Sequence, residues 1–431
     1  MFNSVLPAVV LTVPLADLPA DWRARALRWA AGFPHCAYFE SNDLPYPQGP
    51  FERLLAVAPA ADGPHSLTDL QEWLGRHESA APRCGFVTYE VKNEIEALTS
   101  QNFYGFAWPR LHFFTPQTWL CWRQDAVEIH GQTVGVLADI LAQPVPAVAP
   151  PQVPAFRPRL GRTAYLQAVD AIREDILNGE VYELNLCQEF YAEGVELDPV
   201  DVFLRLMAAS PAPFAGFVRW HEHFLLCASP ERFVARRDEL VWSQPIKGTI
   251  RRGATPAEDE QQRQALLNDE KERAENLMIV DLVRNDLARV AQTGTVRVPE
   301  LFGLYPFRHL WQMISTVTAR LLPGADVVDV LRATFPMGSM TGAPKIRAMQ
   351  LIEHYENTRR GLYSGSIGCV WPGGNFDFNV VIRSLQYRRD TGYLSFQVGS
   401  AITYDSDPER EYDECVLKAK ALLEVLGTKI G

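Results

Sequence analysis

Two periodicities of apolar residues alternate along the C-terminal part of the chain. Apolar positions three and four residues apart predict a helix over residues 163–178, which Gly179 ends. Alternation of apolar and polar residues predicts strands at 182–190, 214–220, 224–228, 232–236 and 240–243. Because blocks of strands are separated by blocks of helices, the pattern predicts an α+β fold and not a doubly wound sheet.

Capping residues predict where other helices begin and end. Thr255 and Glu258 form a capping box with a proline at the first helical position, which predicts a long helical region ending near Val290. Asp407, which a proline follows, predicts the start of the last helix, and Gly427 predicts its end. The remaining predicted elements are a helix over 343–355 and a meander of strands over 363–404.

A proline-rich segment divides the chain. Residues 143–158 contain six prolines, and proline fixes φ and lacks a backbone donor, so we expect a stiff, extended connector. It separates an N-terminal region, residues 1–142, from a C-terminal catalytic domain, residues 159–427. At 431 residues the chain is long enough for two domains or for one large composite domain.

Composition excludes several classes of partner. The net charge is −11 and no block of lysine and arginine is present, which argues against nucleic acid or an anionic membrane as the main partner. Seven scattered cysteines without a C-x-x-C pair indicate reduced thiols in a cytoplasmic protein, not a disulfide frame or a zinc site. The apolar run Val5–Leu15 contains two prolines and is too short to span a bilayer, so we expect an early strand there.

Acidic residues in two predicted helices are candidates for a metal site. Glu411, Glu414 and Lys418 lie on one face of the last helix, and two carboxylates one turn apart suit a hard dication. Glu275 lies in an apolar helical stretch, where a buried charge would need a partner. The alternative for these patterns is solvated charges with a surface salt bridge.

Two glycine-containing segments are candidates for a functional site. Residues 338–345 form a glycine-bounded turn before a helix, and a helix N-terminus attracts anions, although an ordinary turn fits equally well. Lys247 follows a predicted strand, in a loop between a proline and a glycine that leaves it room to reach inward. A loop lysine is more often a solvated surface residue.

The order of these motifs closely resembles that of the chorismate-utilising enzymes, from about residue 160 to residue 425. From the N-terminal side, the motifs are SPERF (229–233), PIKGTIRRG (245–253), AENLMIVDLVRNDL (274–287), RHL (308–310), GSMTGAPKIRAMQLIE (338–353), YSGSIG (363–368), DFNVVIRSL (377–385) and DSDPEREYDE (405–414). The resemblance implies two β-sheets packed orthogonally as a sandwich with surrounding helices. It also implies Mg²⁺ as cofactor and chorismate as substrate.

The resemblance implies a role for each matching residue. Glu275 and Glu414 match direct magnesium ligands, and Glu411 matches a ligand that acts through water. The positions that match substrate-binding residues are His309, Ser339, Tyr363, Arg383, Gly399 and Lys418. Because chorismate is a dianion, the glutamates would repel it unless Mg²⁺ lies between them and its ring carboxylate.

One lysine indicates a branch of this family. Lysine in PIKGT resembles the aminodeoxychorismate synthases, in which its amine adds to ring C2, the 4-hydroxyl leaves, and ammonia then adds at C4. We therefore expect the pKa of Lys247 to be lowered to ~8 by burial. Glu231 matches the general acid, for which we expect a raised pKa in a partly desolvated site. Glu183 replaces the lysine base of isochorismate and salicylate synthases, which favours amination over hydration.

Partner and alternatives follow from the same resemblance. The chain has no G-x-C-x-G nucleophile elbow, so we expect ammonia to come from a separate glutamine amidotransferase subunit. The alternatives are anthranilate synthase component I, which would not need Lys247, and a catalytically inactive chorismate-binding regulatory protein. Residues 37–41 resemble the element that lines the tryptophan pocket of anthranilate synthases, although a strand that ends in a polar turn is the simpler interpretation.

Overall fold

Two antiparallel sheets form the centre of the computed structural model, which describes residues 10–76, 79–146, 151–308 and 310–431. The first sheet contains twelve strands, in the order β1 (Val10–Pro14), β7 (Ala126–Gly131), β6 (Thr118–Trp122), β3 (Leu54–Ala58), β2 (His35–Glu40), β10 (Phe214–Trp220), β11 (His223–Ser229), β20 (Ser384–Arg388), β21 (Tyr393–Ile402), β9 (Glu183–Ala192) and β17 (Gly342–Ala343), with β8 (Arg157–Pro158) beside β9. The second contains nine, in the order β14 (Ile246–Arg251), β16 (Leu310–Arg320), β13 (Leu240–Gln244), β12 (Arg232–Arg237), β19 (Phe376–Asn379), β18 (Ser366–Val370), β4 (Arg83–Val87) and β5 (Leu111–Phe114), with β15 (Arg297–Pro306) beside β16.

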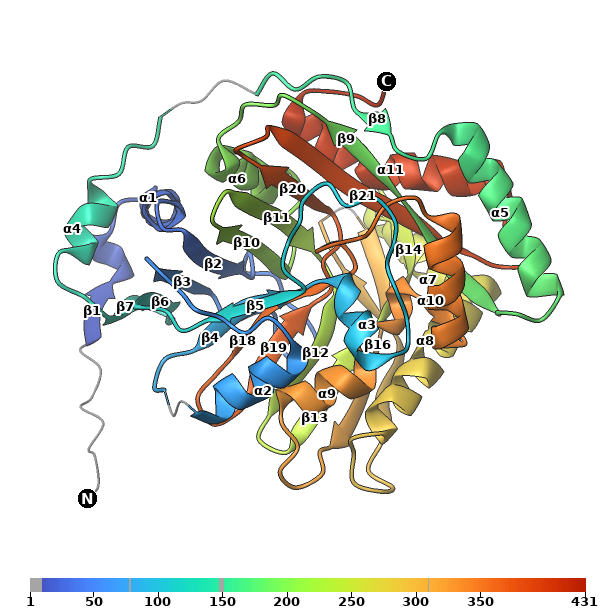
Figure 1. Ribbon diagram of the computed structural model, residues 1–431, viewed down its shortest axis with the longest axis horizontal. Coiled ribbons are helices and arrows are strands. Elements are labelled where there is room, and N and C mark those ends of the chain that lie inside the picture. Colours follow the sequence, from blue (N-terminus) through green and yellow to red (C-terminus); the bar gives the residue numbers. More distant parts are fainter. Residues whose placement is uncertain (1–9, 77–78, 147–150, 309) are drawn as a thin grey trace.

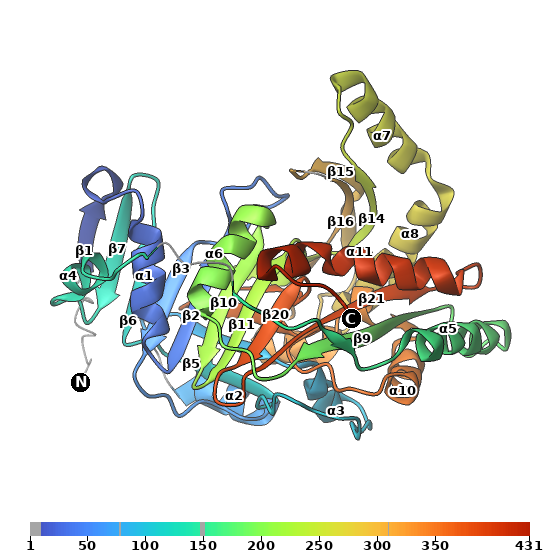
Figure 2. The same ribbon diagram turned by 90° about the horizontal axis from the view of Figure 1, so that it is seen from above.

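The sheets pack face to face, and helices cover their outer faces (Figures 1 and 2). Phe39 of β2, Phe86 of β4 and Leu225 of β11 belong to one buried cluster between the sheets. The first sheet is covered by α1 (Trp22–Ala31), α4 (Val136–Leu141), α5 (Arg162–Leu177), α6 (Pro199–Ala209), α10 (Lys345–Tyr355) and α11 (Pro408–Leu426). The second is covered by α2 (Leu67–Arg76), α8 (Glu270–Ala288) and α9 (Val327–Thr334). The α+β prediction is confirmed.

Strands from both sides of the proline-rich segment share both sheets. β2 pairs with β10 in the first sheet, and β4 pairs with β18 in the second. This arrangement agrees with one large composite domain, because neither part of the chain completes a sheet alone. The boundaries 1–142, 143–158 and 159–427 stay a proposal for the organisation of the chain.

Capping residues set the bounds of several helices. The side chain of Asp407 accepts a hydrogen bond from the Arg410 amide at 3.0 Å, and Gly427 ends α11 with a φ of 63°. The long helical region predicted from residue 255 to near Val290 is present. It divides into α7 (Pro256–Asn268) and α8 at Asp269, which leaves helical geometry and caps α8 by accepting from the Glu272 amide at 3.0 Å. Figure 2 shows α7 and the start of α8 projecting from the rest of the molecule.

The early strand predicted for the N-terminal run is present as β1 over Val10–Pro14, and residues 5–9 lie outside the described residues. No helix in the described ranges is long and apolar enough to cross a membrane. All seven cysteines are buried free thiols.

Candidate active site

Lys247 lies in strand β14 and not in the predicted loop. The register between β14 and β16 shifts between Ile246 and Thr249, so the strand bulges at Lys247 and Gly248. Gly248 has a φ of +97°, a conformation that side chains other than hydrogen disfavour. Bulges re-aim side chains, and here the Lys247 side chain is only 13% exposed. The loop prediction is wrong because pairing with a strand some sixty residues later is not visible in local sequence.

Helix α8 supports this bulge through one buried amide. Asn276 donates a hydrogen bond from Nδ2 to the carbonyl oxygen of Lys247 at 3.3 Å. Its Oδ1 accepts from the hydroxyl of Ser315 on β16 at 2.6 Å. The fully buried Asn276 therefore ties the bulge, the neighbouring strand and the helix together.

Glu183, at the start of β9, is the hydrogen-bond partner of Lys247. The ammonium Nζ lies 2.8 Å from Glu183 Oε1, and the glutamate is only 1% exposed. Burial by itself lowers the pKa of Lys247, but the charges of Glu183, Glu275 and Glu231 outweigh it, and the pKa is raised above its ordinary value. The predicted lowering of this pKa is therefore wrong for the ligand-free chain, because burial here comes with three carboxylates.

Glu231 lies between β11 and β12 and is buried. Burial raises its pKa to about 7, while the Ser339 side chain, the Ile246 backbone and the charges of Lys247 and Arg383 act in the opposite direction. The raised pKa expected from the sequence is confirmed. A carboxyl group with this pKa can carry a proton near neutral pH and donate it.

Three candidate metal ligands face one lysine from two helices. Glu275 on α8 has a pKa raised to about 7, mainly by burial, and lies 3.7 Å from Lys271. Burial lowers the pKa of Lys271, but Glu275, Glu411, Glu272 and Glu414 together raise it. These carboxylates of α8 and α11 therefore lie within electrostatic range of the same ammonium group.

The chemistry of these carboxylates fits a hard divalent cation. Among the side chains that the structure describes, no three His, Cys, Asp or Glu residues converge to metal-binding distance. Even so, the charges of four glutamates raise the pKa of one lysine, and burial raises the pKa of Glu275 to about 7. Carboxylate oxygens are the ligands that Mg²⁺ prefers.

The two α11 glutamates have different local partners. Glu414 accepts from Lys418 at 2.7 Å, whereas the buried Glu411 accepts from the Ser406 hydroxyl at 2.7 Å. Lys418 also donates to the carbonyl oxygen of Gly399 on β21 at 2.8 Å. At Gly399 a Cβ atom would lie 2.5 Å from the Cys187 sulfur, so this position requires glycine.

Two of the remaining candidate substrate residues lie near Glu231. Ser339, in the 3₁₀ helix Gly338–Met340, and Arg383 both act on the pKa of Glu231. Burial lowers the pKa of Arg383, which Glu231 opposes. The buried Tyr363 hydroxyl accepts from the Cys187 thiol at 3.8 Å, opposite Gly399. His309 lies outside the described residues.

Residues 35–424 match the family model described as chorismate binding enzyme. The chain belongs to this family. Among its relatives, aminodeoxychorismate synthase component 1 of Klebsiella aerogenes is 43% identical over 272 residues, which are 63% of this chain and 60% of that protein. Anthranilate synthase component 1 of Aquifex aeolicus is 39% identical over 277 residues, 64% of this chain and 55% of that protein. The chain thus spans less than two thirds of these curated relatives.

The similarity in fold covers more of the chain than the sequence alignments do. The crystal structure of anthranilate synthase component I from Streptococcus pneumoniae superimposes with a TM-score of 0.74 at 26% identity, covering 97% of this chain and 93% of that one. The two-sheet architecture is therefore that of the chorismate binding enzymes. Two named activities occur among relatives of similar identity, so identity alone does not separate them.

Sequence reasoning missed how Glu183, Asn276 and Lys271 act in this chorismate binding enzyme. The sequence identifies Glu183 only as the residue in place of a lysine base, whereas the structure places its carboxylate 2.8 Å from Lys247 Nζ. A signal was present for Asn276 and Lys271, since both lie in the charged helical stretch around Glu275. Their partners belong to other segments, so the sequence could not assign them.

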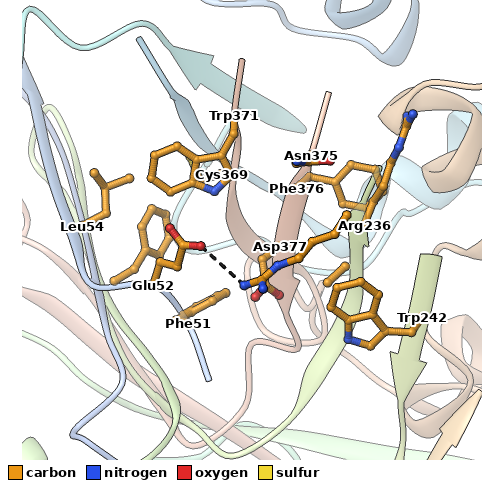
Figure 3. A pocket seen from close by; sticks show the side chains of 13 residues that line it. Phe51, Glu52, Leu54, Arg236, Trp242, Cys369, Trp371, Asn375, Phe376 and Asp377 are labelled. Carbon is orange, nitrogen blue, oxygen red and sulfur yellow. Dashed lines mark hydrogen bonds and ion pairs between the residues drawn. The ribbon is translucent and has the colours of Figure 1, made fainter. Parts of the chain in front are cut away.

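A separate pocket of about 120 Å³ does not include these residues among its described lining. Figure 3 shows the aromatic side chains of Phe51, Trp242 and Trp371 around it. Phe39 of β2 also lines it, from the segment compared with the tryptophan element. β2 ends at Glu40, which binds Arg53 at 2.6 Å and the Asn42 amide at 2.7 Å, so the segment is a strand that ends in a polar turn. The resemblance to the tryptophan element stays a prediction.

Proposed function

We propose that this chorismate binding enzyme is component I of an aminodeoxychorismate synthase, which converts chorismate and ammonia to 4-amino-4-deoxychorismate. The observation that carries the proposal is the buried amine of Lys247, 2.8 Å from Glu183 and among the carboxylates of the candidate metal site. Hydration or direct aromatisation of the ring would not need an amine there. The names of the relatives from Klebsiella aerogenes and other organisms support the same reaction.

Lys247 must lose a proton before it can attack the ring. At an ordinary lysine pKa only about one amine in two thousand is neutral at pH 7, and the raised pKa of Lys247 makes the fraction smaller. Glu183 Oε1 already accepts a hydrogen bond from this amine, so it would act as general base and take the proton as the nitrogen attacks the ring. The neutral amine then adds to ring C2.

Departure of the 4-hydroxyl completes the first step. The ring electrons shift as the Lys247–C2 bond forms, and the C4–O bond breaks. Glu231, whose pKa is about 7, donates its proton so that the group leaves as water. Ammonia then adds at C4 and expels the lysine, which regenerates the free side chain.

Glu275 and Glu414 would hold Mg²⁺ directly, and Glu411 through water. The bound ion would neutralise these carboxylates and anchor the ring carboxylate of chorismate. Arg383 and Lys418 are the proposed partners of the second carboxylate; Lys418 would exchange its present contacts for it. Ser339, Tyr363, Gly399 and His309 are the other proposed substrate-binding positions.

Ammonia would come from a separate glutamine amidotransferase subunit in the cytoplasm. The component naming of the relatives supports a second component, and the scattered free thiols suit a reducing compartment. Free ammonium at high pH is expected to replace the partner in vitro.

The test is mass spectrometry of the chain with chorismate and Mg²⁺ but without ammonia. We expect a covalent adduct on Lys247, absent in Lys247→Ala. With ammonium added, the product should be the aminated ring with no release of pyruvate. Anthranilate fluorescence together with pyruvate would instead identify an anthranilate synthase, and binding without any turnover would identify a regulatory protein.

A further inference from the structure

A second cavity, of about 390 Å³, lies between the segment 88–110 and Arg359. Its described lining includes none of the candidate active-site residues. Tyr104 and Trp108 supply aromatic surface, while Glu90, Arg110 and Arg359 supply charge. A concave site with a few converging charged groups is typical of small-ligand binding.

Glu90 is the least satisfied polar group of this cavity. It is only 6% exposed, and its Oε1 accepts one long hydrogen bond, from the Gly361 amide at 3.3 Å. Its Oε2 is buried and accepts no hydrogen bond from any residue that the structure describes. Buried carboxylate oxygens without donors are costly and rare, which points to a donor from outside the chain.

Arg359 offers the opposite charge on the same cavity. Its Nε donates to the Asn102 carbonyl oxygen at 3.1 Å, and its guanidinium lies 5.8 Å from the centre of the Tyr104 ring. The two terminal nitrogens make no hydrogen bond or ion pair within the described ranges, so they are free for a carboxylate, which guanidinium binds in a paired geometry. Arg359 and Glu90 are close enough to influence each other electrostatically without forming an ion pair.

Neighbouring contacts hold this cavity in place. The buried Lys92 donates to Asn93 at 2.8 Å and to Ser100 at 3.1 Å, and so is bound by neutral groups and not by Glu90. The Tyr89 amide donates to the Gly361 carbonyl oxygen at 2.8 Å, which fixes the Glu90 segment against the Arg359 segment. The two segments that carry the charged groups are therefore held against each other before a ligand binds.

We propose that this cavity binds a free α-amino acid, with the ammonium group on Glu90 and the carboxylate on Arg359. An α-amino acid carries both charges on one carbon, which matches one buried anion beside one free guanidinium. A simple amine would leave Arg359 without a partner, and a simple acid would leave Glu90 without one. The proposal concerns binding, and it does not depend on the reaction at Lys247.

Calorimetric titration of the full chain with each standard α-amino acid tests this site. We expect at least one to bind, and its 2-hydroxy acid and its α-carboxamide analogues to bind at least about tenfold more weakly, since each lacks one charged partner. Binding should persist with saturating chorismate and Mg²⁺. Displacement by chorismate would place the ligand in the active site and overturn the proposal.

Variants connect the binding to the two charged residues. Glu90→Gln and Arg359→Gln should each weaken binding about tenfold or more, while Glu96→Gln, a nearby carboxylate outside the cavity lining, should leave it unchanged. Thermal unfolding of each variant checks its folding. If Arg359→Gln does not fold, Arg359→Lys replaces it in the binding test. The proposal is overturned if no amino acid binds, or if every one that binds does so equally well in both variants.

Discussion

Replacing Glu183 by glutamine separates two roles that this carboxylate can have. The change removes one negative charge and keeps the shape of the side chain 2.8 Å from Lys247 Nζ. A hydrogen bond between charged groups contributes about 1.5–3 kcal/mol. Since about 1.4 kcal/mol corresponds to one pKa unit, the pKa of Lys247 should fall by about one to two units. The fraction of neutral amine at pH 7 would then rise about tenfold to a hundredfold.

The rate of adduct formation distinguishes the two roles. If Glu183 only holds the lysine in its charged form, Glu183→Gln forms the adduct faster than the unmodified chain. If Glu183 accepts the proton, the loss of a general base slows the step by about a hundredfold to ten-thousandfold, despite the larger supply of neutral amine. We expect the second result.

The assay is quenched-flow mass spectrometry of the Lys247 adduct, with saturating chorismate and Mg²⁺ and without ammonia, over a range of pH. Glu180→Gln is the matched control, because Glu180 lies three residues away on the surface, paired with Arg347. An adduct rate in Glu183→Gln that equals or exceeds the unmodified rate at every pH would refute the proposed proton transfer.

Three further outcomes follow from the described contacts. Gly248→Ala should slow adduct formation while chorismate binding persists, because a residue with Cβ at a φ of +97° costs about 1–3 kcal/mol and would deform the bulge; an unchanged adduct rate would contradict this. Glu275→Gln should raise the melting temperature of the metal-free chain, since it removes a buried, poorly balanced charge, and should abolish the further rise caused by Mg²⁺, as differential scanning fluorimetry would detect. Burial lowers the pKa of His35 to about 4 and that of His112 to about 3, so between pH 7 and pH 5 the unfolded chain binds protons that the folded chain does not. The free energy of unfolding should therefore fall by about 2 kcal/mol per histidine from pH 7 to pH 5. In urea unfolding, His112→Gln should lose less stability over this pH range than the unmodified chain.

The sequence by itself determined features that depend on near neighbours along the chain or on the order of motifs. Asp407, Pro408 and Gly427 bound α11 because capping groups act within one helical turn. The motif order indicated the family and the positions of Glu231, Glu275 and Glu414, since each lies inside a contiguous motif.

Only the tertiary structure decided which side chains contact each of these residues. The bulge that aims Lys247 requires β16, and the carboxylate that raises its pKa comes from β9, sixty-four positions earlier in the chain. Burial would lower the pKa of a lysine and nearby carboxylates raise it, so even the sign of the shift depends on side chains that meet only after folding. Local periodicity contains no information about such distant partners.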